Sequence, residues 1–394
     1  MKPIRLVSLI LLAGAIVCAQ TPPAQRPQPQ VTAPQTPPGP VTSPEVLADH
    51  RVTFRLRAPN AKEVRVEIEG ASNSPAMRKD AEDVWSATSE PLAPDYYGYS
   101  FVVDGVAMFD PSNSATIPNF LYRASELHVP PASGNFGVSS SPAWEIADVP
   151  HGEIHHHYYR SKVVGDDRGY FVYTPPGYDP RRKQTYPVLY LLHGYSDDAN
   201  AWTAVGRANV ILDNLIARGK ANPMLMVMPL GYGAPEILLP SSGGFNAPGI
   251  RQRNFDRFRE ALLSEVIPRV EAEYLVKKGR DSRAIAGLSM GGAESLLTGL
   301  NTLNEFAWIG AFSSGGITPD FDKEFPALDA SANAQLRLLW IACGTDDNLI
   351  ELSRAFRLWL ASKGIHHADI ETPGAHTWLV WRRNLTEFAP FLFR

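Results

Sequence analysis

The pattern of hydrophobic and polar residues changes twice along this 394-residue chain. Residues 20–45 are dense in proline and have almost no other apolar side chains. In residues 46–130 short runs alternate between apolar and polar positions, and from about residue 149 the runs become longer and fully apolar. Alternation is typical of strands with one buried face, whereas continuous apolar runs are typical of buried parallel strands. The pattern therefore predicts a small all-β module followed by an α/β domain.

The alternating region, residues 46–130, predicts an antiparallel β-sandwich. Asp-Gly and Pro-Asn turn signals accompany its short alternating runs, at residues 52–56, 64–68, 84–87 and 97–105. Proline-rich residues 20–45 predict a disordered linker before it, and Ser, Pro and Gly in residues 131–148 predict a second linker after it. We therefore expect the module to fold as a unit with its own core.

Residues 149–394 combine buried strands with amphipathic helices. Fully apolar runs occur at residues 187–192, 224–229 and 338–342, and residues 210–220 and 255–274 have helical apolar spacing. This alternation predicts an α/β fold with a mostly parallel central sheet covered on both faces.

Residues 1–19 have the features of a secretory signal peptide. Lys2 and Arg5 precede an apolar stretch and small residues at a cleavage position, and the stretch is too short to span a membrane. We expect a secreted or periplasmic protein without an integral membrane segment after signal removal. Val17 directly before Cys18 disfavours lipoprotein anchoring through that cysteine.

Charge excludes two classes of partner. The formal net charge is −4, and loss of the two positive charges of the signal makes it −4 − 2 = −6. A mildly acidic protein has no electrostatic basis for binding nucleic acid or an anionic membrane.

Candidate chemistry centres on Gly287-Leu288-Ser289-Met290-Gly291. This G-x-S-x-G sequence follows a β-prone run at residues 282–286 and precedes helical composition at residues 293–300. Strand, G-x-S-x-G and helix together are typical of the nucleophile elbow of α/β-hydrolases, in which the glycines make room around a strained serine. Ser289 is the candidate nucleophile.

An α/β-hydrolase serine needs an acid and then a histidine, both at the ends of later strands. Asp346 and Asp347 directly follow the apolar run 338–342, so either can supply the carboxylate. His376 lies in the loop after a short predicted strand at residues 368–371, which makes it the candidate base.

The remaining candidates stabilise or contact the substrate. The backbone amides of Tyr195, after an apolar strand ending in His193-Gly194, and of Met290 are expected to form an oxyanion hole. His193 precedes the nucleophile in the chain and is interpreted as a structural loop residue.

Aromatic side chains near these motifs are the candidate substrate-binding residues. Trp202, Trp378 and Trp381 can stack on sugar or cinnamate rings, although Trp202 and Trp381 can equally pack the loops. We expect no metal and no cofactor, since the histidines at 151 and 155–157 alternate between faces of a strand without a nearby acid or cysteine to complete a site.

Four motifs in the predicted α/β domain resemble those of one enzyme family. Residues 173–178, 186–194, 287–292 and 374–382, which ends in Trp381-Arg382, are similar to the esterase D-like carbohydrate esterases, among them bacterial feruloyl and acetylxylan esterases. In that family the acid lies in a Gly-Thr-x-Asp loop, so the resemblance implies Asp347 rather than Asp346. The N-terminal module, at residues 54–61 and 99–105, is similar to the immunoglobulin-like modules that precede glycogen-branching enzymes.

Together the residues and the resemblance predict a secreted serine esterase. It would remove feruloyl or acetyl groups from plant-type polysaccharide or a smaller aromatic ester through an acyl-enzyme on Ser289. Two alternatives stay open: an enterochelin-type siderophore esterase, which also joins a sandwich module to such a domain, and a non-catalytic carbohydrate-binding protein.

Overall fold

The computed structural model describes residues 39–71, 75–131, 141–239, 241 and 243–394. The predicted signal peptide 1–19, with Cys18, and most of the proline-rich linker lie outside these residues, as do residues 132–140 of the second linker. No helix in the described ranges is long and apolar enough to cross a membrane.

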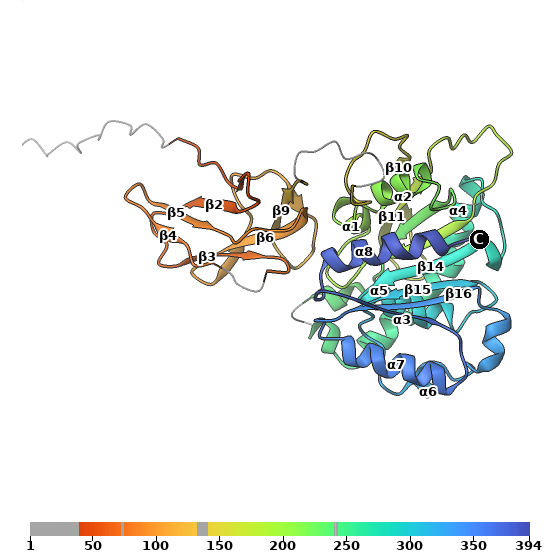
Figure 1. Cartoon of the computed structure of the whole chain (residues 1–394). Coiled ribbons are helices and arrows are strands. Elements are labelled where there is room, and N and C mark those ends of the chain that lie inside the picture. Colours follow the sequence, from red (N-terminus) through yellow and green to blue (C-terminus); the bar gives the residue numbers. More distant parts are fainter. Residues whose placement is uncertain (1–38, 72–74, 132–140, 240, 242) are drawn as a thin grey trace, which may run out of the picture. The chain divides into compact units, whose positions relative to one another are not determined.

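Two antiparallel sheets form the N-terminal module (Figure 1). Their inward residues, among them Phe54, Val66 and Tyr99, share one apolar core, because the alternating pattern turns every second side chain inward. The four predicted runs are all strands, whereas the six-residue strand Ala124–Val129 inside one sheet and the shorter remaining strands were not predicted. An immunoglobulin-like classification stays a prediction. One sheet has the order β1 (Glu45–Val46), β2 (Val52–Arg57), β5 (Val84–Thr88), β4 (Arg78–Lys79); the other has β3 (Val64–Ile68), β6 (Asp95–Val103), β9 (Ala124–Val129), β8 (Thr116–Ile117), with β7 (Val106–Met108) paired to β6.

The second part of the chain is built on an eight-stranded sheet. β12 to β17 pair in parallel, and β10 and β11 extend the sheet in antiparallel fashion beyond β13. The expected mostly parallel sheet is therefore present. The strand order is β10 (Glu153–Arg160), β11 (Asp167–Thr174), β13 (Leu225–Pro229), β12 (Val188–Leu192), β14 (Arg283–Leu288), β15 (Trp308–Phe312), β16 (Leu338–Gly344), β17 (Ala368–Thr372).

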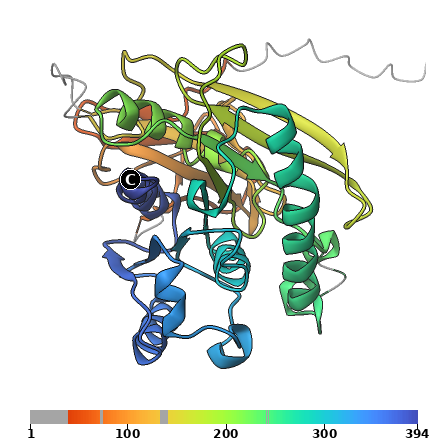
Figure 2. The same ribbon diagram turned by 90° about the vertical axis from the view of Figure 1, so that its right-hand side faces the viewer.

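Helices cover both faces of this sheet and create two apolar cores. Leu189 and Leu191 face the core shared with α2 and α8, whereas Tyr190 and Leu192 face the core shared with α3, α5 and α7. Figure 2 shows α3 and α4 as one long helical segment seen from the side. A π-helical turn at Leu262–Val266 interrupts the helix predicted for residues 255–274. The helices are α1 (Ala201–Ala204), α2 (Ala208–Ala217), α3 (Ile250–Ala261), the π turn η4 (Leu262–Val266), α4 (Ile267–Glu273), α5 (Met290–Gly299), α6 (Phe321–Glu324), α7 (Ile350–Ser362) and α8 (Trp378–Phe388), with 3₁₀ turns η1 (Pro235–Leu238), η3 (Gly244–Asn246), η5 (Arg280–Ser282), η6 (Ala330–Ala334) and η7 (Ala389–Phe391).

Buried contacts join the module to the α/β part, and residues 41–394 form one unit. Tyr96 and Ile117 of the module belong to the same apolar cluster as Trp378. Arg382 of α8 is fully buried and donates to Asp95 and to the carbonyl oxygen of Tyr96. The module also has the core of its own that we expected, and its folding as a separate unit stays a prediction.

Candidate active site

Ser289 lies at a tight turn between β14 and α5. Its backbone has φ 51° and ψ −116°, a conformation that L-residues rarely adopt. A Cβ on Gly287 would lie 2.5 Å from the backbone of Gly291, and a Cβ on Gly291 would lie 2.5 Å from the carbonyl oxygen of His193. Both glycines are therefore required by close backbone approach, as the sequence pattern predicted.

A chain of hydrogen bonds connects Ser289 to His376 and Asp347. His376 Nε2 lies 3.0 Å from Ser289 Oγ, and His376 Nδ1 lies 2.8 Å from Asp347 Oδ2. Asp347 follows β16 and His376 follows β17, so the carboxyl ends of parallel strands β14, β16 and β17 bring the three side chains together. In this arrangement a histidine can accept the serine proton while a carboxylate fixes its tautomer.

The structure distinguishes the two neighbouring aspartates. Asp347 is buried and its Oδ1 accepts the amide of Leu349 at 2.9 Å, while Asp346 is exposed. Burial by itself would raise the pKa of the Asp347 carboxyl. The hydrogen bond and positive charge of His376, with the Leu349 amide, outweigh burial and hold that pKa below its ordinary value. Asp347 is therefore the carboxylate that His376 contacts.

Two free amides lie beside Ser289. In the described part of the chain neither Tyr195 nor Met290 donates its amide hydrogen to a protein acceptor. The Tyr195 loop approaches the serine closely, since a Cβ on Gly194 would lie 3.4 Å from Ser289 Cβ. Free amides close to a serine hydroxyl can bind the oxygen of a tetrahedral intermediate.

His193 supports this loop. Its Nδ1 donates to the carbonyl oxygen of Gly194 at 2.8 Å, and its Nε2 accepts the amide of Gly231 at 2.9 Å. Burial lowers the pKa of His193 to about 4, so the ring is neutral at physiological pH. Both ring nitrogens are occupied, which agrees with the interpretation of His193 as a structural residue.

The predicted substrate-binding tryptophans have different surroundings. Trp202 is 0% exposed and its Nε1 donates to the carbonyl oxygen of Leu192, so its prediction as a substrate-binding residue is wrong. Trp381 packs its ring edge-on against His376 with centroids 4.8 Å apart. Trp378 is mostly buried but lines a cavity, so its contact with substrate stays a prediction.

Several residues near the Tyr195 loop were not identified from the sequence. Asn119 of the module donates through Nδ2 to Ser196 Oγ at 3.0 Å and to Asp197 Oδ1 at 2.9 Å, and the amide of Phe120 donates to the Ser196 carbonyl oxygen at 2.7 Å. Tyr195 packs edge-on against Phe245. No periodicity or motif marks these residues, because their partners lie far away in the sequence.

A cavity of about 410 Å³ opens between these contacts, with walls from both parts of the chain. Glu69, Tyr99, Asn119 and Tyr122 come from the module, and Asp197 and Trp378 come from the α/β part. A larger cavity of about 940 Å³ lies around Pro187, Ser282 and Trp308, at the amino ends of the parallel strands and so away from Ser289.

The described residues contain no group of three or more His, Cys, Asp or Glu side chains that could hold a metal ion. Cys343 is buried in β16, and burial raises the pKa of its thiol to about 11. The hydrogen-bonded serine, histidine and aspartate are thus the groups near the elbow that are arranged for chemistry.

Comparison with known proteins finds similarity to esterases. Residues 161–392 match the model of a protein family described as "Putative esterase". An endo-1,4-beta-xylanase/feruloyl esterase of Xylanibacter ruminicola is 30% identical over 357 residues, which are 89% of this chain and 46% of that protein. The chain thus spans about half the length of the first curated relatives that it matches.

Two solved structures show the extent of the fold. A CE1 ferulic acid esterase of Anaeromyces mucronatus in complex with ferulic acid has TM-score 0.54 at 25% identity and covers 63% of this chain and 93% of its own. An enterobactin esterase of Shigella flexneri in the presence of enterobactin has TM-score 0.63 at 20% identity, covering 87% of this chain and 92% of its own. Residues 149–394 make up less than two thirds of the chain, whereas the likeness to the enterobactin esterase covers 87% of it. That likeness therefore extends into the N-terminal module.

Proposed function

We propose that this chain, which belongs to the esterase family matched by residues 161–392, hydrolyses carboxylic esters through a serine nucleophile. The observation that carries the proposal is the hydrogen-bond chain from Ser289 Oγ through His376 to Asp347 at the carboxyl edge of a parallel sheet. A non-catalytic carbohydrate-binding protein would have no need for this strained, hydrogen-bonded serine.

In the proposed acylation step, Ser289 Oγ attacks the ester carbonyl carbon while His376 Nε2 takes the hydroxyl proton. Asp347 holds the Nδ1 hydrogen and stabilises the imidazolium that forms. The carbonyl oxygen gains negative charge and is stabilised by the amides of Tyr195 and Met290. His376 then gives its proton to the departing alcohol oxygen, which leaves an acyl group on Ser289.

Water completes the proposed cycle. His376 removes a proton from a water molecule, and the resulting hydroxide attacks the acyl carbon. The second tetrahedral intermediate uses the same two amides. Its collapse returns the proton to Ser289 Oγ and releases a carboxylic acid.

We propose feruloyl or acetyl groups on plant-type polysaccharide, or smaller aromatic esters, as the substrate class. The supporting observation is the 30% identity to a protein named endo-1,4-beta-xylanase/feruloyl esterase, which extends over 89% of this chain. The rings of Tyr195 and Phe245 pack together at the loop that carries the proposed oxyanion hole, and the Phe120 ring packs edge-on against Tyr232, whose hydroxyl donates to the Asp197 carbonyl oxygen. The pattern of residues 1–19 supports export as part of this proposal.

A siderophore triester is the second candidate substrate. The likeness to an enterobactin esterase structure includes the N-terminal module, whereas the likeness to the ferulic acid esterase covers 63% of this chain. At 20% identity this likeness is evidence for a shared fold and not for a shared substrate.

An ester panel on the purified full chain tests the proposal. The substrates are methyl ferulate, acetylated xylan, p-nitrophenyl acetate and enterobactin, with products identified by liquid chromatography. Ferulate or acetate release supports the proposed class, and dihydroxybenzoyl-serine release supports the siderophore esterase. Absence of turnover on every ester would contradict the proposed function.

A further inference from the structure

The helix that follows the proposed catalytic histidine is capped by a residue from the other part of the chain. α8 begins at Trp378, two residues after His376, and the side chain at its N-cap, Thr377, makes no capping hydrogen bond. The Trp378 amide instead donates to Oε1 of Glu69 at 2.7 Å, across 309 residues of sequence. The first amides of a helix lack intrahelical acceptors, and a carboxylate there also interacts favourably with the helix dipole.

Glu69 is itself held in place. Its Oε2 accepts the amide of Gly98 on β6 at 3.0 Å, so both carboxylate oxygens have a backbone donor. Burial raises the pKa of Glu69, and the charge of Arg382 opposes that effect. Glu69 is therefore a fixed acceptor rather than a freely moving surface side chain.

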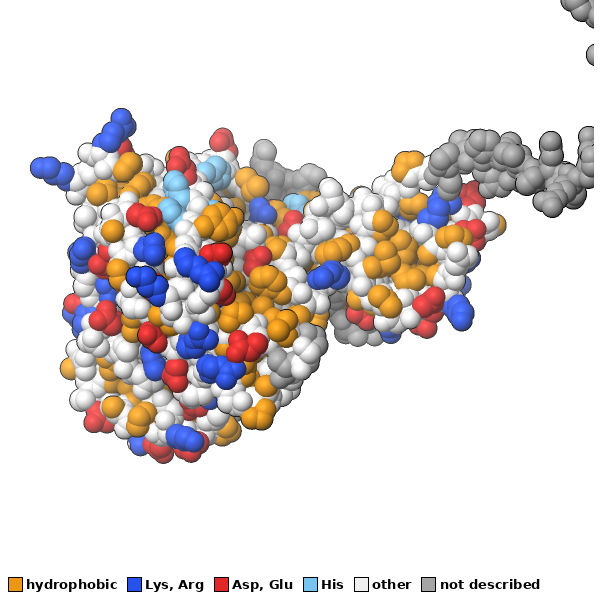
Figure 3. Space-filling model, turned by 180° about the vertical axis from the view of Figure 1, so that it is seen from behind, with side chains coloured by type: hydrophobic (Ala, Val, Ile, Leu, Met, Phe, Trp, Pro, Cys, Tyr) orange, Lys and Arg blue, Asp and Glu red, His pale blue; other side chains and the backbone are white. Residues whose placement is uncertain are grey.

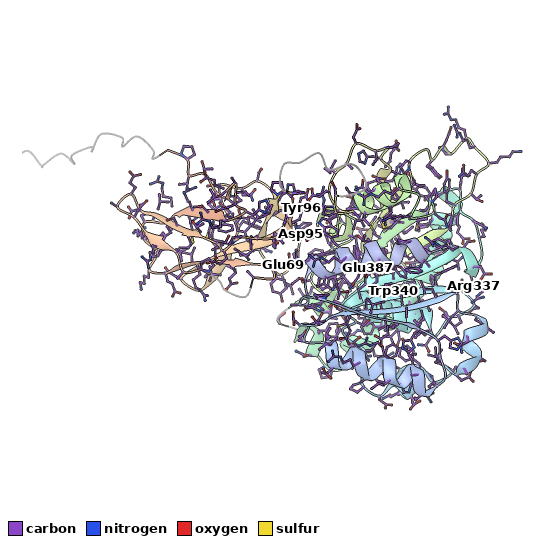
Figure 4. The ribbon with its side chains drawn as sticks, in the orientation of Figure 1. Glu69, Asp95, Tyr96, Arg337, Trp340 and Glu387 are labelled. Carbon is purple, nitrogen blue, oxygen red and sulfur yellow. The ribbon has the colours of Figure 1, made fainter. Side chains whose placement is uncertain are left out.

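A second contact fixes the same helix one turn further on. Arg382 Nη2 donates to Asp95 Oδ1 at 2.8 Å, with the side chains 0% and 1% exposed. Figure 4 shows Glu69, Asp95 and Tyr96 close together at one end of the module. The start of α8 is thus tied to the module at two successive turns.

Movement of this helix would be transmitted to the histidine. The amide of Trp381 donates to the Thr377 carbonyl oxygen, and the Trp381 ring packs edge-on against His376. The position of the His376 ring therefore depends on the first turn of α8.

The module also holds the opposite side of the site. Asn119 Nδ2 donates to Ser196 and Asp197, the two residues after Tyr195. Ser196 has φ 72°, a left-handed conformation that is unfavourable without such support. The geometry of the loop that carries the proposed oxyanion amide therefore depends on Asn119.

We propose that Glu69 and Asn119 are positioning residues of the active site, Glu69 for the histidine through α8 and Asn119 for the oxyanion loop. This inference rests on the proposed function. Neither residue touches the reacting atoms; each fixes a loop that does. Reaction rates fall steeply when reacting groups are displaced by as little as about 1 Å, so losing either contact should reduce turnover rather than substrate binding.

The test uses full-length Glu69→Ala and Asn119→Ala with p-nitrophenyl acetate. Titration with a fluorophosphonate counts reactive serines, so turnover is expressed per active site and an unfolded fraction does not contribute. We expect kcat per titrated site to fall about tenfold to a hundredfold, with KM within about twofold of wild type. Glu63→Ala and Asn60→Ala, at exposed positions of the same module, are the controls and should leave both constants unchanged.

Glu69→Gln provides a conservative variant that keeps an acceptor for the Trp378 amide. It should recover most of the lost turnover, staying about three- to fivefold below wild type, and it carries the test if Glu69→Ala does not fold. If kcat per titrated site equals the wild-type value in all folded variants, the inference is overturned. The hydrogen bonds of Glu69 and Asn119 would then serve only the stability of the fold. Failure of the wild-type chain to hydrolyse esters or to react with the fluorophosphonate would instead contradict the proposed function.

Discussion

Asp347 and His376 are joined by a 2.8 Å hydrogen bond between Oδ2 and Nδ1, although 29 positions separate them in the sequence. The bond arises because β16 and β17 are parallel neighbours whose carboxyl ends meet at one edge of the sheet. Asp346, one position earlier, is exposed. Substitution of Asp347 should therefore affect activity far more than the same substitution of Asp346.

Asp347→Asn should reduce kcat by about 10⁴-fold, because an amide favours the wrong histidine tautomer. Asp346→Asn should change kcat by no more than about twofold, since its side chain does not reach His376. Steady-state hydrolysis of p-nitrophenyl acetate by both variants measures the difference. A larger loss in Asp346→Asn would show that the acid has been assigned to the wrong residue.

Asp95→Ala should lower the free energy of unfolding by about 3–5 kcal/mol, because it leaves the buried Arg382 charge without its partner. Asp49→Ala is the matched control, since it breaks an Asp–Arg pair that is exposed on both sides and should leave the free energy of unfolding nearly unchanged. Urea unfolding followed by tryptophan fluorescence measures both. Equal losses would mean that Arg382 does not depend on Asp95.

Asp197 should make stability depend on pH. Burial raises the pKa of this carboxyl to about 8, above its unfolded value of 3.8. The stability due to the raised pKa is fully present below pH 3.8 and is lost as pH rises toward about 8. Asp197→Asn removes this titration, so between pH 5 and 8 wild type should lose up to about 1.4 kcal/mol per pH unit more than the variant. Parallel pH profiles in urea unfolding would contradict the assignment.

A protein that starts near Ala143 tests the dependence of the α/β part on the module. The sequence led us to expect hydrolysis of small esters within a few-fold of the full chain. The hydrogen bonds of Tyr96 and Glu69 with α8 now predict that the truncated protein either does not fold or loses at least about tenfold in kcat per titrated site. Circular dichroism and titrated turnover measure this. A folded truncated protein with nearly full activity would instead show that the α/β part works independently of the module.

The parts of the site that sequence predicted correctly are local. Gly287, Ser289 and Gly291 lie within five residues of each other. A side chain at either glycine would collide with nearby backbone, so the glycines themselves reveal the tight turn. The order of acid and base follows from chain topology, which placed His376 after a short predicted strand and left Asp346 and Asp347 as alternative acids. The choice of Asp347 came from the family resemblance. The face of the molecule seen in Figure 3 carries Lys and Arg side chains mixed with Asp and Glu side chains, as expected for a chain with similar numbers of both.

The parts that the sequence did not predict depend on contacts between distant segments. Glu69 and Trp378 meet across 309 positions, and nothing in the alternating pattern of the module marks Glu69 as a cap. Trp202 was misassigned because a tryptophan after a loop motif looks the same whether its ring faces solvent or packs beneath β12. β15 was not predicted, since its short run contains Gly310 and lacks an adjacent chemical motif.

The turnover of Ser289→Ala on p-nitrophenyl acetate tests the central claim most directly. Removing the hydroxyl leaves the backbone of β14 and α5 in place, so circular dichroism and the unfolding midpoint should match wild type. The proposed mechanism predicts that kcat falls by about a millionfold, as expected when a triad nucleophile is removed. A folded Ser289→Ala protein that keeps more than about a tenth of wild-type activity would show that another group performs the reaction.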